Sequence, residues 1–318
     1  GGLGVKAFKG HVLAEGVDPA DLLYYIKAMF RTYIENGDFQ HRNANRTRFL
    51  VESMGIDKFR DAFNKSLTYA KRTENLHFDL PDTKITKTGE MTLTAAGLEG
   101  NPRVSPQSQT GLYAVAYHPL GGQVKSEIMT QVFRYVGSLE AGEARLTGTE
   151  GAYFINLTAD EAAKVIALTP DHQDSVFGQS VSCIGSARCQ VGFQNSMGLL
   201  ETIVAYLAEQ GIDDKFLPRI HISGCPSSCG THQIGSLGFH GGVKLVDKKP
   251  QPAFTLFRGG TDELGHVAFG EQVGNLTIVD IPKFVADLAM ALNDAGQPFD
   301  TWIVDHVADF NSIVAKYL

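Results

Sequence analysis

Four cysteines are the residues of this chain best suited to chemistry. They stand at Cys183, Cys189, Cys225 and Cys229, in the spacing C-x5-C-x35-C-x3-C, and they are all the cysteine that the 318 residues contain. Two pairs of thiols in one short window indicate that four soft ligands meet at one point in space. We therefore expect a metal centre.

Three kinds of cysteine site compete. Disulfide bonds are typical of small secreted domains, whereas this chain is long and shows no leader-like apolar run at its start. Structural zinc sites usually have about two to four residues between paired ligands, so the longer first gap is wide for zinc. An iron–sulfur cluster needs four thiolates around a larger body. The spacing favours a cluster over zinc and zinc over disulfides, and it leaves all three open.

The residues around the cysteines suit a cluster, because small side chains let backbone N–H groups approach the sulfides. They are Gly185, Ser186, Ala187, Gly224, Ser227, Ser228 and Gly230. An apolar stripe then predicts an amphipathic helix over residues 190–210, closed by Gly211. Its members are Phe193, Met197, Leu200, Val204 and Leu207. We expect the helix to start at Cys189, with its unpaired N–H groups toward the thiolates.

This motif resembles that of the nitrite and sulfite reductase family. The resemblance rests on C-x5-C, the following helix, a short strand over 219–223 and the segment Ser-Gly-Cys-Pro-x-x-Cys-Gly. It implies that all four cysteines hold a [4Fe–4S] cluster, and that Cys229 also ligates the iron of a sirohaem and so joins the two cofactors. One position departs from the family, which usually has an acidic residue where this chain has Ser236.

Composition excludes several other classes of protein. The chain is 43% hydrophobic and 20% charged, with a net charge of −7, which is ordinary for a globular protein. It has no apolar run long enough to span a bilayer and no Lys/Arg run, so we expect neither a membrane nor a nucleic acid as partner. Reduced cysteines and a reductase-like motif predict a cytoplasmic location.

The first 110 residues predict a helical region and a linker. A helix should open at Asp18 and end at Gly37. Its apolar face carries Leu22, Ile26, Phe30 and Tyr33. We expect residues 1–73 to be mainly helical. Residues 74–110 have few large apolar side chains and no periodicity, which predicts a long linker and a domain boundary.

Residues 111–170 predict a small helix-backed sheet in the order βαββα, whose last helix opens with a Thr-x-x-Glu capping box. This unit resembles the ferredoxin-like half-domain that precedes each sirohaem unit in the family. The resemblance makes Thr147 and Thr149 candidate sirohaem contacts, while Glu150 stands where an amide or a base is expected. An exposed hairpin turn is the alternative interpretation.

Residues 171–318 complete the architecture as a [4Fe–4S]/sirohaem-binding α/β domain. Their tail, from Gly259 to Gly296, echoes the pattern from Gly1 to Gly37, which agrees with the internal duplication of the family. The expected fold class is therefore α+β. On this interpretation residues 1–73 are the tail of a first repeat, and an N-terminal half or a second subunit supplies the rest.

The resemblance implies a six-electron reduction, of sulfite to sulfide or of nitrite to ammonia, fed by an electron donor protein or domain. In the family the first repeat supplies the arginines and lysines that bind the anion, and no such motif is visible here, so no substrate-binding residue is assigned. His232 is a candidate proton donor or hydrogen-bond partner of the cluster, with a purely structural histidine as the other interpretation. Ser227 and Ser228 are candidate cofactor contacts.

A second hypothesis is a cluster- or zinc-bearing module that transfers electrons or holds a fold, without sirohaem. Cofactor content separates the two hypotheses, because the module needs no tetrapyrrole.

Overall fold

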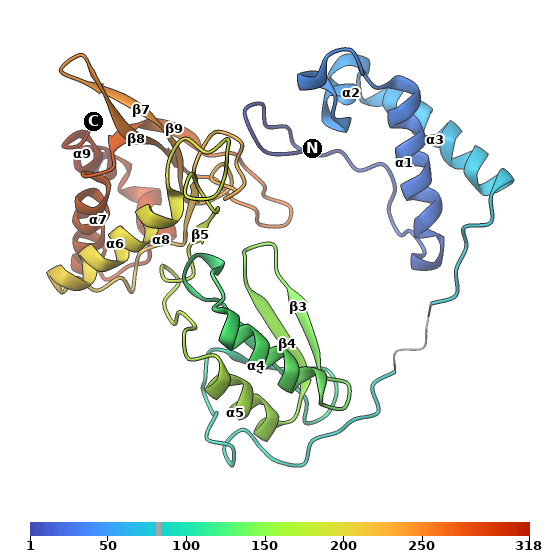
Figure 1. The fold of residues 1–318 in the computed structure, drawn as a ribbon, viewed down its shortest axis with the longest axis horizontal. Coiled ribbons are helices and arrows are strands. Elements are labelled where there is room, and N and C mark those ends of the chain that lie inside the picture. The colour runs from blue at the N-terminus through green and yellow to red at the C-terminus, as the bar shows by residue number, and fades with distance from the viewer. Residues whose placement is uncertain (81–83) are drawn as a thin grey trace. The chain divides into compact units, whose positions relative to one another are not determined.

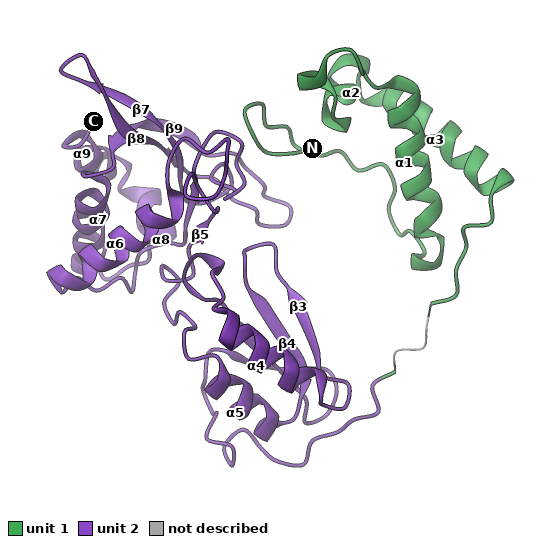
Figure 2. Cartoon of the chain, viewed as in Figure 1, with its two compact units in different colours: residues 1–84 green, residues 85–318 purple. Residues whose placement is uncertain are grey.

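The chain divides into two units, one built of helices and the other of helices and sheets, which confirms the α+β class. The computed structural model describes residues 1–80 and 84–318. Unit 1 comprises residues 1–84 and unit 2 comprises residues 85–318 (Figure 2). Of the helices in the described ranges, none combines the length and the apolar character needed to cross a bilayer.

Unit 1 is helical, as predicted. Its helices are α1 (Leu22–Asn36), α2 (Thr47–Met54) and α3 (Ile56–Thr73), with 3-10 turns at Pro19–Asp21 and Arg42–Ala44. Asp18 opens the first turn by accepting a hydrogen bond from the N–H of Ala20 at 2.9 Å. Gly37 ends α1, since its N–H donates to the carbonyl of Tyr33 at 2.8 Å. Both ends of the predicted helix are therefore confirmed.

The apolar face predicted for α1 is wrong. The side chains that α1 buries are Tyr24, Ala28 and Thr32. They face α3, where the hydroxyl of Thr32 lies 3.3 Å from that of Ser66. The predicted inner side chains are largely exposed, at 47% for Leu22, 56% for Ile26 and 59% for Phe30. Ala28 and Thr32 are small and let α1 and α3 approach closely, so these two positions and not Leu22, Ile26 and Phe30 mark the contact with α3.

Unit 2 begins with an antiparallel sheet covered by two helices. The strand order is β1-β2-β4-β3. The strands are β1 (Val104–Pro106), β2 (Tyr113–Tyr117), β3 (Glu143–Leu146) and β4 (Ala152–Leu157), and the helices are α4 (Ser126–Gly137) and α5 (Ala159–Leu168) (Figure 1). Both hydrogen bonds of the capping box between Thr158 and Glu161 are present. The βαββα order predicted from residue 111 onward is confirmed.

Residues 85–110 differ from the linker expected over 74–110. β1 pairs with β2 at the edge of the sheet, and Leu98 belongs to its core. The buried ammonium of Lys87 lies 2.5 Å from the carboxylate of Glu161. These separate contacts hold residues 85–110 to the sheet. Because the residues that make them do not recur at a helix or strand period, the sequence shows no pattern that predicts them.

The remainder of unit 2 is built on a mixed sheet in the order β5-β6-β7-β8-β9. Its strands are β5 (Val181–Ser182), β6 (Ile220–Ser223), β7 (Leu237–Val246), β8 (Lys249–Arg258) and β9 (Glu271–Thr277). β5, β6 and β7 run parallel, whereas β8 is antiparallel to β7 and β9. The helices of this part are α6 (Ser196–Gln210), α7 (Ile281–Ala295), α8 (Phe299–Asp305) and α9 (Val307–Ala315) (Figure 1). One apolar core joins sheet and helices and includes the fully buried Phe239, Phe254 and Phe284.

The start predicted for the helix after the first cysteine pair is wrong. α6 begins at Ser196 and not at Cys189, because the side chain of Asn195 caps it and accepts a hydrogen bond from the N–H of Gly198 at 3.1 Å. Phe193, expected on the inner stripe, precedes the helix and is 66% exposed. The predicted end is confirmed, since Gly211 closes α6 in the left-handed conformation with φ 64°.

Candidate functional site

The four cysteines lie on two loops at one edge of the five-stranded sheet. The first cysteine loop, residues 183–195, joins β5 to α6; the second cysteine loop, residues 224–236, joins β6 to β7. β5 and β6 are parallel neighbours, with Ser182 opposite Ile222. Both loops therefore leave the carboxyl ends of adjacent strands, which is where open α/β sheets bind their ligands. This topology brings thiols from distant parts of the sequence together.

The cysteines are unpaired thiols, and they lie near enough for their charges to interact. Three are partly exposed, and Cys229 is exposed. Burial, followed by the charges of Cys183, Cys225 and Cys189, raises the pKa of Cys229 above its usual value. In the described ranges, however, no group of three or more His, Cys, Asp or Glu side chains is close enough to hold a metal ion. The four thiols therefore share one region of the fold, at the carboxyl ends of β5 and β6, without forming such a group.

The first cysteine loop is held mainly by backbone groups. The Sγ of Cys183 accepts a hydrogen bond from the N–H of Gly224 at 3.1 Å, which links the two loops at the sulfur. The hydroxyl of Ser196 donates to the carbonyl of Cys183 at 2.7 Å, so the start of α6 lies beside this cysteine. Gly185 has φ 58°, and a Cβ there would lie 2.6 Å from the backbone N of Ser196. N–H groups directed at a ligand sulfur are the kind of contact that stabilises a bound cluster.

The second cysteine loop is strained and carries an unpaired polar atom. Ser228 and Thr231, on either side of Cys229 and Gly230, adopt left-handed backbone with φ 62° and 53°. The side chain of Ser228 is buried, and its Oγ has no hydrogen-bond partner, whereas Ser227 is exposed. A buried hydroxyl without a partner is unfavourable, so it fits a group that binds here. Four thiols, the Gly224 N–H at the Cys183 sulfur and this hydroxyl together fit the donor set of a cluster with an adjoining cofactor.

His232 is a buried residue of the second cysteine loop. It is 1% exposed, and its Nδ1 lies 3.0 Å from the Oγ of Ser223. Burial lowers the pKa of His232 to about 3, which keeps the imidazole neutral at ordinary pH. A ring in this position has no surface from which to take up protons. The structure thus places the predicted proton donor among packed side chains.

The predicted sirohaem contacts Thr147 and Thr149 share the turn between β3 and β4. Their hydroxyls lie 3.1 Å apart, and the Thr147 hydroxyl accepts a hydrogen bond from the N–H of Gly151 at 2.9 Å. The same turn carries Glu150, which has φ 65° and accepts a hydrogen bond from the N–H of Ser182 at 3.1 Å. The turn therefore contacts β5 one residue before Cys183.

Glu150 and Arg219 are two side chains of unit 2 that were not among the predicted site residues. Burial raises the pKa of Glu150 to about 7, so this carboxyl holds or releases a proton near neutral pH. Arg219 precedes β6 and donates to the side chain of Gln179 at 3.1 Å, but its buried Nε has no partner. The sequence carried a signal for Glu150, because an acid replaced an expected amide. It carried none for Arg219.

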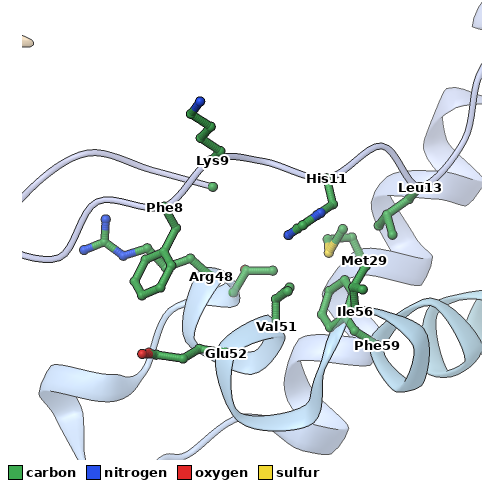
Figure 3. Close-up of a pocket in the computed structure, with 12 residues that line it drawn as sticks. Phe8, Lys9, His11, Leu13, Met29, Arg48, Val51, Glu52, Ile56 and Phe59 are labelled. Carbon is green, nitrogen blue, oxygen red and sulfur yellow. The ribbon is translucent and has the colours of Figure 1, made fainter. Parts of the chain in front are cut away.

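Cavities in unit 1 involve no cysteine. One, of about 310 Å³, is lined by apolar side chains including Met29, Val51 and Phe59, with His11 directed into it and Lys9 pointing away (Figure 3). A second, of about 740 Å³, is lined in part by the exposed residues Ile26 and Phe30 of α1. Both cavities are lined in part by His11. The cysteine loops of unit 2 remain the candidate site.

A comparison with protein-family models matches residues 1–71 to the nitrite and sulphite reductase 4Fe-4S domain. The matched region is unit 1 and does not include the cysteines. The matched family is nevertheless the one that the cysteine motif of unit 2 resembles, so two separate parts of the chain point the same way.

Curated relatives extend the similarity over most of the chain. The chain is 26% identical to ferredoxin–nitrite reductase of Betula pendula over 277 residues, which cover 84% of this chain and 44% of that protein. It is 25% identical to ferredoxin–nitrite reductase of Synechococcus elongatus over 85% of this chain and 51% of that protein. Sulfite reductase [ferredoxin] 1 of Mycolicibacterium paratuberculosis is 25% identical over 80% of this chain and 43% of that protein. The chain thus spans about half the length of these relatives.

A solved structure shares the fold. The NirA protein of Mycobacterium tuberculosis matches with a TM-score of 0.71 at 19% identity, over 96% of this chain and 56% of that chain. The motif, the family model, the relatives and the fold agree that this chain is similar to the nitrite and sulfite reductases.

Proposed function

We propose that this chain is the cofactor-carrying part of a sirohaem-dependent nitrite or sulfite reductase. The observation that carries the proposal is the convergence of four thiols at the carboxyl ends of β5 and β6. Cys183, Cys189 and Cys225 are the proposed cluster ligands, and Cys229 is the proposed ligand shared with the sirohaem iron. When bound, a [4Fe–4S] cluster held by these thiols would supply electrons to the sirohaem iron, which would hold the substrate.

The surrounding residues of this chain prepare the site. The N–H of Gly224 is directed at the Cys183 sulfur, where it stabilises negative charge on a ligated thiolate. The unpaired hydroxyl of Ser228 is our first choice as a cofactor contact, and we place Thr147 and Thr149 as further contacts. Reducing nitrite or sulfite also consumes protons, and Glu150 is the group near the cysteine loops whose pKa of about 7 suits a proton store.

The substrate is nitrite or sulfite, and the electron donor is a reduced ferredoxin. Relatives named as ferredoxin-dependent reductases of both anions support this choice. Because the chain spans about half their length, we propose that the arginines and lysines that bind the anion come from outside residues 1–318, either from an N-terminal half or from a second subunit. Four unpaired cysteines suit a reducing compartment, so we place the protein in the cytoplasm.

The test is a visible absorption spectrum of anaerobically purified protein, with iron, zinc and acid-labile sulfide measured on the same sample. Sirohaem bands with about five irons per chain are the expected result. Iron and sulfide without tetrapyrrole would support the module without sirohaem instead. Zinc without sulfide would overturn the proposal.

A further inference from the structure

One serine hydroxyl connects the second cysteine loop to the core beneath it. The N–H of Gly230, the residue after Cys229, donates a hydrogen bond to the Oγ of Ser223 at 3.1 Å. The same oxygen lies 3.0 Å from the Nδ1 of His232. Ser223 and His232 are each 1% exposed. Because the Gly230 N–H already points at the serine oxygen, the serine proton is available for the imidazole nitrogen, and the three groups form one chain of hydrogen bonds.

The loop needs such support because its backbone is strained where it carries a cysteine. Ser228 and Thr231 both have positive φ, a conformation that is unfavourable for a residue with a side chain. Gly230 is pressed against β6, since a Cβ there would lie 2.0 Å from the carbonyl oxygen of Ile222. Strained backbone persists only where surrounding contacts determine it. The hydrogen bond to Ser223 is such a contact.

The imidazole that ends this chain is itself fixed in place. Its ring centroid lies 5.0 Å from that of His240 and 5.0 Å from that of Phe257. The backbone next to it is equally close-packed, because a Cβ on Gly238 would lie 1.9 Å from the carbonyl oxygen of His232. The ring therefore presents Nδ1 to Ser223 in one orientation. This rigidity lets it orient a hydroxyl group.

We propose that His232 is a positioning residue that acts through Ser223 on the Gly230 N–H and thereby holds the turn that carries Cys225 and Cys229. It does not donate protons to the substrate. The inference rests on the proposed function in one respect, namely that these thiols are cofactor ligands. It assigns His232 a role that the cysteine motif does not specify.

The test separates the hydrogen bond from the ring. His232→Asn can keep a polar atom for Ser223, whereas His232→Phe keeps an aromatic ring against His240 and Phe257 but loses the hydrogen bond. Ser223→Ala removes the middle of the chain. His240→Phe is the matched control, because it changes a neighbouring ring for which the structure shows no hydrogen bond to Ser223 or Gly230.

Two measurements are made on each full-length variant. The first is amide hydrogen exchange at Gly230 in the cofactor-free protein, which should be at least about tenfold faster in His232→Phe and Ser223→Ala than in wild type, as expected for the loss of one hydrogen bond. The second is the iron and sulfide content, with the electron paramagnetic resonance spectrum of the reduced protein. The signal should shift or broaden in the same two variants, while His232→Asn and His240→Phe resemble wild type.

The outcomes are distinguishable. A wild-type protein without iron and sulfide would defeat the proposed function, while the exchange rate of Gly230 would still decide the positioning role. A wild-type exchange rate and spectrum in His232→Phe would overturn the inference, and so would a His232→Asn protein as disturbed as His232→Phe. If His232→Phe does not fold, Ser223→Ala decides by the same criteria.

Discussion

The two cysteine loops hold their cysteines in place by different contacts. In the first, a glycine, a helix start and the N–H of Gly224 hold Cys183, so main-chain groups dominate. In the second, Cys229 lies between two residues with positive φ and depends on the side chains of Ser223 and His232. The first loop therefore relies on close backbone contacts, which leave no room for a side chain at Gly185. The second combines strain, buried polar groups and the exposed thiol, which are features that concentrate at functional sites.

The largest effect should follow from replacing the cysteine that we propose as the shared ligand. Cys229→Ser should reduce the activity of the complete reductase by more than about a hundredfold. Mutating a residue that merely hydrogen-bonds to a metal ligand already lowers metal affinity or activity by about ten- to a hundredfold. Magnetic coupling between cluster and haem should disappear from the electron paramagnetic resonance spectrum. A coupled spectrum in this variant would contradict the bridging assignment.

Cys183→Ser and Cys225→Ser take one ligand from each loop, and we expect each to lose most of the iron and sulfide, because a cluster needs every thiolate. Elemental analysis of both variants checks this. Should one of them retain full iron and sulfide, its loop does not hold the cluster, and the pairing of the two loops would have to be abandoned.

The glycines next to the cysteines test the packing of each loop. We expect Gly230→Ala and Gly185→Ala to lower the free energy of unfolding by about 2–4 kcal/mol, because each Cβ would overlap backbone atoms, at 2.0 Å from the Ile222 oxygen and 2.6 Å from the Ser196 nitrogen. Gly242→Ala, whose Cβ meets nothing within 4 Å, is the control. Denaturant unfolding of the three variants measures the difference. Equal stability of Gly230→Ala and the control would refute the close packing at β6.

Glu150 predicts a pH dependence at the strand that leads into the first loop. Its pKa is raised by burial from 4.5 to about 7. Across this window the folded protein keeps a proton that the unfolded chain has released, so this group makes stability fall as pH rises and level off above about 7. Glu150→Gln should not show this loss of stability with rising pH. Its free energy of unfolding at pH 8 should exceed that of wild type by about 1–3 kcal/mol.

Unfolding curves at pH 4.5, 6 and 8 test this expectation for Glu150, with Glu127→Gln as an exposed control. A parallel decline with pH in wild type and Glu150→Gln would mean that this carboxyl is ionised normally.

The smallest effect concerns the unpaired hydroxyl. Ser228→Ala should leave the cofactor-free protein as stable as wild type or about 1 kcal/mol more stable, because it removes a buried polar group without a partner. Retention of cofactor should nevertheless fall, while the exposed Ser227→Ala serves as the control. Thermal unfolding measures the stability of each variant, and tetrapyrrole content measures how much cofactor it retains. Lower stability of the cofactor-free protein would show that the hydroxyl has a partner within the fold.

Local signals predicted many of the elements. The capping box at Thr158 marked the start of α5, and Gly211 and Gly37 marked the ends of α6 and α1. Such signals work because they satisfy backbone groups within one or two turns of chain. They failed where a competing cap lay nearby, as at Asn195, and where a stretch is held by isolated anchors, as at Lys87.

The sequence by itself located the four thiols and predicted a metal centre of the nitrite and sulfite reductase type, because a fixed spacing of soft ligands indicates chemistry without reference to any fold. The tertiary structure decided what surrounds them. Three of its features depend on contacts between different segments of the chain. β5 and β6 are parallel neighbours, Glu150 contacts the strand before Cys183, and the buried His232 lies against Ser223. Such contacts follow from packing and topology, which no local pattern encodes.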